Sequence, residues 1–308
     1  MRNRLLVGSR GSQLARKQAE AVISLLQDQG MDYEIESVII QTTGDTNQAA
    51  SLSEIGGKSV FVKELEVALT DHHIDLAVHS LKDVTSAWMP GLAITGFLTP
   101  ESICDTLICR YPLTVETLPP QAKIGTGSMR RKALLSTARS DLCYHDIRGN
   151  VETRLRKLLQ APLDAVVLSE AGMIRLGFLP NSFPGLRSFE FEGQQYWTYR
   201  LEKEWFFPAP GQGVVAIEHR VDDEDLMGYI KKISDPHQTR ISQLELGLLS
   251  VLGFDCRIPF GSYVELQGDQ FAVHVFHPNG QESIRVGNDL DALNTIQKWA
   301  QLLKERLV

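Results

Sequence analysis

The sequence predicts an α/β protein that ends in a smaller α+β region. Twice in succession, short apolar runs typical of buried strands alternate with segments whose apolar residues recur at helical spacing. This β-α-β order favours a mostly parallel sheet in each of the two runs. From residue 236 onward the order changes to a helix, three strands and a final helix, which indicates a separate small domain.

The first run shows the alternation most clearly. Gly30 is a helix stop, and Val62, Leu65 and Leu69 fall on one stripe of a second helix. The predicted elements are a strand at 5–8, a helix from Ser12 to Gly30, a strand at 34–40, a helix at 61–70 and a strand at 75–80.

The second run repeats the pattern after the segment 112–120, PLTVETLPP, which we expect to be the boundary between the runs. A hairpin is expected within 189–199, and the acidic stretch 222–225 indicates a solvated surface segment. The predicted elements are a strand at 122–126, a helix from Ser128 to Ala138, a strand at 142–147, a helix capped by Asn150, a strand at 164–169 and a short helix at 170–177.

The C-terminal region is predicted to contain a helix that stops at Gly253 and a final helix with apolar residues at helical spacing. The strands between them are expected near 262–266, 271–276 and 283–286.

Composition narrows the class of protein. The chain has 308 residues, 43% of them hydrophobic, and a net charge of −7, which argues against general nucleic-acid binding. The N-terminal apolar run is too short for a signal peptide, and no run is long enough to cross a membrane. The four cysteines form no C-x-x-C pair, and no metal-site spacing occurs. We therefore expect a cytoplasmic protein without a metal.

Positive charge is concentrated in one part of this acidic chain. Residues 121–160 hold nine Lys and Arg against three acids. Arg130 and Arg131 occupy the first turns of a predicted helix, and Arg148 lies at the next strand-to-helix turn. These turns meet at the carboxyl edge of a sheet, where α/β folds bind ligands.

Arginines at a helix start oppose the helix dipole, which suggests that they serve an anionic ligand. Arginine also suits the bidentate recognition of carboxylates. Arg10 and Arg175 repeat the arrangement after other strands. Any single arginine is more often part of a solvated face, but five at successive strand ends favour an anion site. IGTGS at 124–128 is neither a P-loop nor a dinucleotide fingerprint.

The motifs that carry this charge resemble those of the porphobilinogen deaminase family, also called hydroxymethylbilane synthases. The resemblance covers most of the chain, with its blocks in the family's order. They are GSRGSQLA at 8–15, IGGKSVFVKELEVAL at 55–69, AVHSLKDV at 77–84, GTGSMRRKALL at 125–135, RGNVETRL at 148–155, GMIRLG at 172–177, PGQGVVAIE at 210–218 and CRIPFGSY at 256–263.

The resemblance implies two domains like type II periplasmic binding proteins and a small α+β C-terminal domain. The implied domains are 1–99 with 206–231, 104–205, and 236–308. It further implies a monomer that joins four porphobilinogen molecules and releases ammonia from each, giving the linear tetrapyrrole hydroxymethylbilane. The implied primer is a dipyrromethane held by a thioether to Cys256, and the implied partners are porphobilinogen and the growing polypyrrole chain, with no nucleic acid and no membrane.

The resemblance also assigns site residues. Asp83 matches the catalytic aspartate, whose carboxylate would stabilise the cation left when ammonia departs; from spacing alone it fits a helix N-cap equally well. The residues implied to hold the cofactor are Cys256, Lys82, Ser128, Arg130, Arg131 and Arg148. Those implied to bind substrate are Arg10, Ser12, Arg148, Arg154, Arg175, Lys58 and Gln212.

Some positions depart from the family pattern. Phe254 and Asp255 replace the usual glycine pair before Cys256, and Gly127 stands where a second serine is common. These departures leave open an alternative of another class, a two-lobed anion-binding protein that no longer polymerises. A DNA-binding regulator is disfavoured, since no helix-turn-helix or basic segment for DNA is present.

Overall fold

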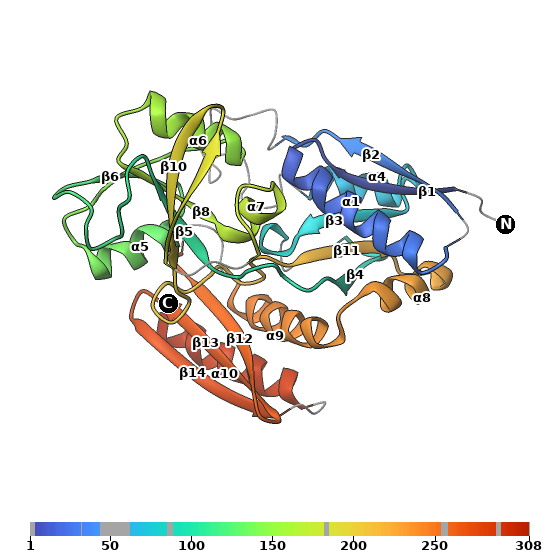
Figure 1. The fold of residues 1–308 in the computed structure, drawn as a ribbon. Coiled ribbons are helices and arrows are strands. Elements are labelled where there is room, and N and C mark those ends of the chain that lie inside the picture. Colours follow the sequence, from blue (N-terminus) through green and yellow to red (C-terminus); the bar gives the residue numbers. More distant parts are fainter. Residues whose placement is uncertain are drawn as a thin grey trace.

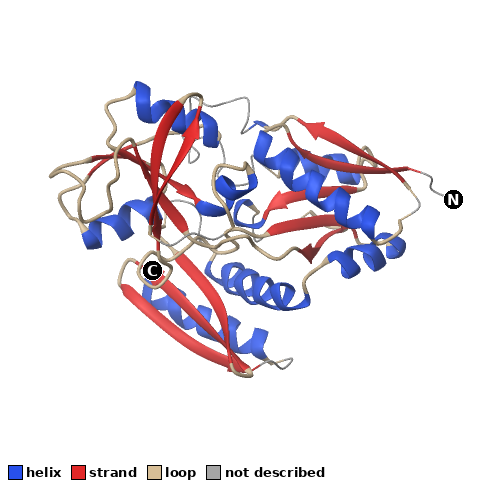
Figure 2. Cartoon of the chain, in the orientation of Figure 1, coloured by secondary structure: helices blue, strands red, loops and turns tan. Residues whose placement is uncertain are grey.

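Three sheets organise the chain in a computed structural model (Figure 1). The structure describes residues 4–31, 33–43, 62–84, 89–181, 185–253, 258–287 and 291–307. The first two sheets stand side by side, and the third lies below them. Helices cover the faces of the sheets, so the protein is of the α/β class with two lobes and a smaller third part (Figure 2).

The first sheet has the strand order β2-β1-β3-β11-β4. β1 pairs in parallel with β2 and β3, whereas β11 runs antiparallel to β3 and β4. Apolar residues of α1 and α8 cover one face, and those of α4 cover the other. The elements are β1 (Arg4–Arg10), α1 (Gln13–Asp28), β2 (Glu34–Ile40), α4 (Lys63–Thr70), β3 (Leu76–Ser80), the 3-10 turn η2 (Leu81–Asp83), β4 (Leu92–Phe97), β11 (Val215–Arg220) and α8 (Glu224–Ile233).

The second sheet has the order β7-β6-β8-β5-β10-β9. Only β6, β7 and β8 pair with one another in parallel. The hairpin of β9 and β10 extends the sheet through antiparallel pairing with β5. α5 packs on one face, while α6 and α7 pack on the other. The elements are β5 (Asp105–Cys109), β6 (Lys123–Gly125), α5 (Met129–Ala138), β7 (Cys143–His145), α6 (Val151–Gln160), β8 (Ala165–Ser169), α7 (Glu170–Arg175), β9 (Leu186–Phe191) and β10 (Gln194–Leu201).

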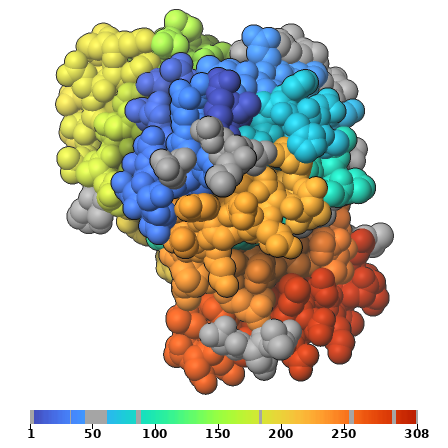
Figure 3. Space-filling model, turned by 90° about the vertical axis from the view of Figure 1, so that its right-hand side faces the viewer, coloured from blue at the N-terminus to red at the C-terminus, as the bar shows by residue number. Residues whose placement is uncertain are grey.

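The third sheet is an antiparallel meander of β12 (Gly261–Gln267), β13 (Gln270–His277) and β14 (Gly280–Gly287). α9 (Pro236–Leu252) and α10 (Ala292–Leu307) pack together on this sheet around one apolar core. In the space-filling view, this part of the chain, orange to red, projects below the rest (Figure 3).

Most of the predicted elements are confirmed. The strand at 34–40 has the expected bounds, and Ser12, Ser128 and Asn150 cap the helices that follow them. Each cap accepts a backbone N–H that would otherwise lack a partner at the helix start, which explains why these local signals were reliable. The hairpin and the meander also lie where they were expected.

Two expectations about the fold were wrong. The two larger sheets are mixed rather than mostly parallel, because β5, β9 and β11 run in the reverse direction. The segment 112–120 is no boundary, since β5 before it and β6 after it belong to one sheet. The acidic stretch 222–225 lies at the surface, as was expected, and it also begins a helix: Asp223 caps α8, and the acids of the first turn match the helix dipole.

The chain passes twice between the first two sheets, from β4 to β5 and back from β10 to β11. The returning segment contains Gly211 and Gly213, both with φ in the left-handed region. A Cβ on Gly213 would lie 2.1 Å from the carbonyl oxygen of Ser102 in the other crossing segment. Glycine is therefore required where the two crossings touch.

A buried carboxyl group connects the returning segment to the third part of the chain. Glu245, on α9, is 5% exposed, and its Oε2 accepts the backbone N–H of Gly211 at 3.0 Å. Its Oε1 lies 3.4 Å from the Ser262 hydroxyl on β12. Burial raises the pKa of Glu245 to about 8, because the ionised form loses its hydration.

We expect Glu245→Gln to alter how stability depends on pH. The pKa of Glu245 is higher in the folded than in the unfolded chain, so its contribution to stability is full below the unfolded value and is lost as pH rises to about 8. The glutamine keeps an acceptor for Gly211 but has no charge to bury. The difference between the melting temperature of the variant and that of wild type should therefore shift in favour of the variant by at least ~3 °C from pH 5 to pH 9.

Glu20→Gln is the matched control, because Glu20 is exposed and pairs with Lys17 at the surface. Thermal melts at both pH values should give this control a constant difference from wild type. If Glu245→Gln also gave a constant difference, Glu245 would not be protonated in the folded protein near neutral pH.

Candidate functional site

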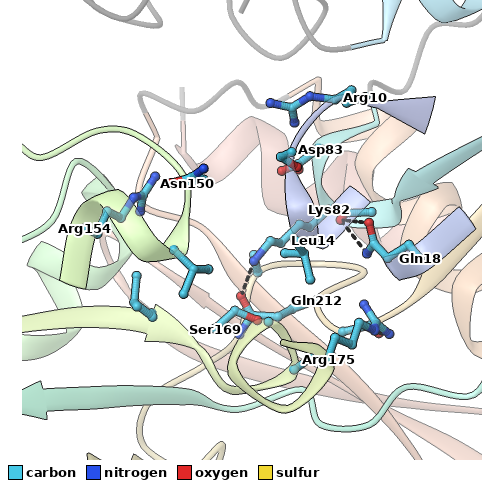
Figure 4. A pocket seen from close by; sticks show the side chains of 18 of the residues that line it. Arg10, Leu14, Gln18, Lys82, Asp83, Asn150, Arg154, Ser169, Arg175 and Gln212 are labelled. Atoms are coloured by element: carbon cyan, nitrogen blue, oxygen red, sulfur yellow. Dashed lines mark hydrogen bonds between the residues drawn. The ribbon is translucent and has the colours of Figure 1, made fainter. Parts of the chain in front are cut away.

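A cavity of about 700 Å³ lies where the carboxyl ends of β1, β3, β6 and β8 meet between the first two sheets (Figure 4). Every predicted site residue that the structure describes lines it. They are Arg10, Ser12, Lys82, Asp83, Ser128, Arg130, Arg131, Arg148, Arg154, Arg175 and Gln212. Lys58 and Cys256 lie outside the described residues.

Two helix starts point hydroxyl groups into the cavity. Ser12 Oγ accepts the Ala15 N–H at 3.2 Å, and Ser128 Oγ accepts the Arg131 N–H at 3.4 Å. Each serine hydroxyl retains its own O–H as a donor. The first turns of α1 and α5 therefore offer N–H and O–H donors to an anion, as was expected from their sequences.

Arg130 and Arg131 have an internal partner that the sequence did not reveal. Asp105, at the start of β5, receives an N–H from each: Arg130 at 2.8 Å and Arg131 at 2.6 Å. The Arg130 and Arg131 side chains also donate to the carbonyl oxygens of Phe207 and Val167. Part of the charge that had been attributed wholly to a ligand is thus balanced within the protein.

Lys82 reaches the middle of the cavity, where its Nζ donates to Gln212 Oε1 at 3.3 Å (Figure 4). Gln212 in turn donates to the Ile103 carbonyl at 2.8 Å. Burial lowers the pKa of Lys82 to about 8; Asp83 opposes this shift, while the charges of Arg131 and Arg130 add to it. Lys82 can therefore gain or lose its charge near neutral pH.

Arg154 and Asn150, on α6, face Asp83 and Arg10 across the cavity (Figure 4). The Nε of Arg154 donates to the Gly149 carbonyl at 2.8 Å. Burial lowers the pKa of Arg154 to about 10, and nearby Arg131 adds to the shift. The guanidinium remains charged at neutral pH, because this value is still well above 7.

Arg175 lies at one edge of the cavity and contacts both crossing segments. Its Nε donates to Glu101 at 2.9 Å, and its Nη2 contacts both Glu101 and the Gly213 carbonyl. The structure thus places Arg175 at the predicted site, but its strongest contacts are with the connections between the sheets.

Asp83 is the one acid among the described residues that line the cavity, and seven cationic side chains surround it. It ends η2, directly after Lys82. The N-cap role that its spacing also allowed is not seen in the described residues, because Asp83 is the last residue of a 3-10 turn and Val84 after it is extended.

Sequence reasoning missed several polar residues of the site, of which three matter most here. They are Gln18, which hydrogen-bonds Ser80 at 2.9 Å in the cavity wall, and the two acids Asp105 and Glu101. An acid directly before the apolar run TLIC was the available signal for Asp105.

Two kinds of site are not found in the described chain. No group of three or more His, Cys, Asp or Glu residues among those described could hold a metal ion. No helix in the described ranges is long and apolar enough to cross a membrane.

Solved structures with similar folds include the methionine-binding protein MetQ, at 13% identity and a TM-score of 0.45, with 79% of this chain and 92% of that chain covered. The periplasmic VFT2 domain of BvgS from Bordetella pertussis has 15% identity and a TM-score of 0.42, with 75% and 85% covered.

The sequence comparisons are far stronger. The family model "Porphobilinogen deaminase, dipyromethane cofactor binding domain" matches residues 5–228. The porphobilinogen deaminase of Syntrophomonas wolfei is 40% identical over 89% of this chain and 84% of its own length. That of Oceanobacillus iheyensis is 39% identical over 87% and 82%. The chain belongs to the porphobilinogen deaminase family.

Proposed function

We propose that this chain joins four molecules of porphobilinogen head to tail, releases ammonia from each and yields hydroxymethylbilane. The observation that carries the proposal is the cavity in which seven cationic side chains surround Asp83. Each porphobilinogen unit brings an acetate and a propionate, so a growing chain needs many fixed cations. Family membership, with relatives covered over most of their length, supports the same reaction.

The cavity suits a dipyrromethane, the cofactor that the family model names. Arg131 Nε is buried without a hydrogen-bond partner among the described residues, so the wall holds an unused donor. Lys82, Ser128, Arg130, Arg131 and Arg148 line the same wall and would hold the carboxylates of the cofactor. Once attached to Cys256, the cofactor would supply the pyrrole carbon to which the first substrate is joined.

Asp83 would act on the substrate itself. When the carbon–nitrogen bond of porphobilinogen breaks, the electron pair leaves with ammonia and a positive charge spreads over the pyrrole. A carboxylate beside the pyrrole nitrogen stabilises that charge. The same carboxylate can then accept the proton released when the new carbon–carbon bond forms.

Arg10, Ser12, Arg154, Arg175 and Gln212 would bind the carboxylates of the substrate and of the growing chain, together with Lys58 and Arg148. We further infer three domains from the three sheets. Their bounds are 1–99 with 206–231, 104–205, and 236–308. We also propose a cytoplasmic monomer that binds no nucleic acid, in keeping with the net charge of −7.

The mass of the intact protein tests the proposal most directly. Wild type should carry an added mass equal to two linked pyrrole units, and Cys256→Ser should lack it, because the thioether needs the thiol. Incubation with porphobilinogen should load any bare wild type. A bare mass that persists after this incubation would contradict the loading of Cys256 and favour a chain that only binds anions.

Replacement of Asp83 by Asn should lower kcat for porphobilinogen consumption by roughly 10²-fold or more, because the neutral amide cannot stabilise the cation. Asp146→Asn is the matched control, since Asp146 is exposed and pairs with Lys132. Steady-state rates on protein of known cofactor content would measure both. A kcat for Asp83→Asn within threefold of wild type would exclude the catalytic role.

The pH dependence of substrate affinity should report the charge of Lys82. Protonated Lys82 attracts carboxylates, and this attraction is lost as pH rises through its pKa of about 8. Lys82→Arg keeps its charge, so the ratio of the wild-type KM to the variant KM should rise on the order of tenfold from pH 7 to pH 9. Any change in the charge of the substrate between these pH values affects both KM values equally and therefore cancels in the ratio. A flat ratio would show that Lys82 keeps its proton or does not contact the substrate.

A further inference from the structure

Asp105 reaches the ligand-binding edge of the second sheet because its strand is reversed. In register, Asp105 of β5 pairs with Ser169, the last residue of β8. Since β5 runs antiparallel to β8, the first residue of β5 lies at the edge where β6 and β8 end. A carboxylate with 0% exposure is thereby placed behind the cavity wall.

One carboxylate holds two neighbouring guanidinium groups. Asp105 Oδ2 accepts from Arg130 at 2.8 Å, and Oδ1 accepts from Arg131 at 2.6 Å. Each arginine has a second fixed contact through a backbone carbonyl, at Phe207 for Arg130 and at Val167 for Arg131. Two contacts on one planar guanidinium group fix its orientation as well as its position.

The fixed direction determines which donors remain for a ligand. Both arginines are 6% exposed, and both line the cavity. Arg131 Nε is buried and has no hydrogen-bond partner in the part of the chain that the structure describes. A buried donor without a partner is costly, so its presence at a cavity wall indicates that a ligand atom satisfies it.

The positive charges of Arg130, Arg131 and Lys82 also require the Asp105 carboxylate. Arg130, Arg131 and Lys82 are close enough that each arginine lowers the pKa of Lys82. Like charges at short range in a partly dry site repel one another strongly. Asp105 offsets this repulsion, and the two arginines hold its own pKa down to about 2, so it stays ionised at any physiological pH.

We propose that Asp105 is a positioning residue that acts through Arg130 and Arg131, holding their free N–H groups toward the carboxylates of the bound pyrroles. The inference rests on the proposed function, because it takes the ligand to be a pyrrole polycarboxylate. Asp105 touches no ligand in this arrangement. Its effect on binding is transmitted by the two guanidinium groups.

The test uses the full-length chain with Asp105→Asn and the matched control Asp141→Asn. Asp141 also holds an arginine with both oxygens, at 2.7 and 2.9 Å, but it lies at the surface and outside the cavity. Three quantities are measured: the melting temperature, the fraction of protein carrying the cofactor by intact mass, and KM and kcat for porphobilinogen per loaded molecule.

Asp105→Asn should lower the loaded fraction and raise KM roughly tenfold or more, with a much smaller change in kcat, because binding common to all steps is weakened. The control should match wild type. In an Arg131→Gln background, Asp105→Asn should add little further loss, because the residue through which it acts is gone. Independent effects that multiply would overturn the proposal.

Asp105→Glu keeps the charge but moves the carboxylate by one methylene group. This variant tests the proposal even if Asp105→Asn does not fold. It should raise KM more than twofold while its melting temperature stays near that of wild type. A wild-type KM in Asp105→Glu would show that charge alone suffices and would sink the positioning role. Wild-type protein without cofactor mass or turnover would instead contradict the proposed function.

Discussion

Mutual repulsion among the cations of the cavity is the constraint on which the rest of the site depends. Seven cationic side chains line one cavity, and several are largely removed from water. Such a group cannot be assembled from arginines alone, since each unpaired buried charge is costly. The protein offsets the charge from behind with Asp105 and at one edge with Glu101, which leaves the front of the wall positive.

The two crossing segments connect this charge balance to the fold. Glu101 lies in one crossing, and Gln212 and Gly213 lie in the other. Arg175 contacts both crossings, and Gln212 joins Lys82 to the Ile103 carbonyl. Glu245 of the third part holds the same returning segment at Gly211. A change in how the parts meet would therefore alter the positions of Lys82 and Arg175.

Asp83 gains its significance from these surroundings. Asp83 lies next to Lys82 and faces Arg154 and Arg10, as the one acid among the described residues that line the cavity. The cations that we propose bind the substrate carboxylates also keep the general charge of the cavity positive. In the proposed reaction, this carboxylate acts on the one part of the substrate that becomes positive.

Local signals allowed much of this protein to be predicted from its sequence. Ser12, Ser128 and Asn150 were recognisable as helix caps, and the motifs around Asp83 and Arg130 identified the family, because both depend on residues close together in the chain. Only the tertiary structure revealed the reversed strands β5 and β11, and with them Asp105 behind two arginines 25 and 26 residues away. The direction of an inserted strand depends on the end of the sheet at which the chain enters it, and the partner of a buried charge depends on what that strand brings to it.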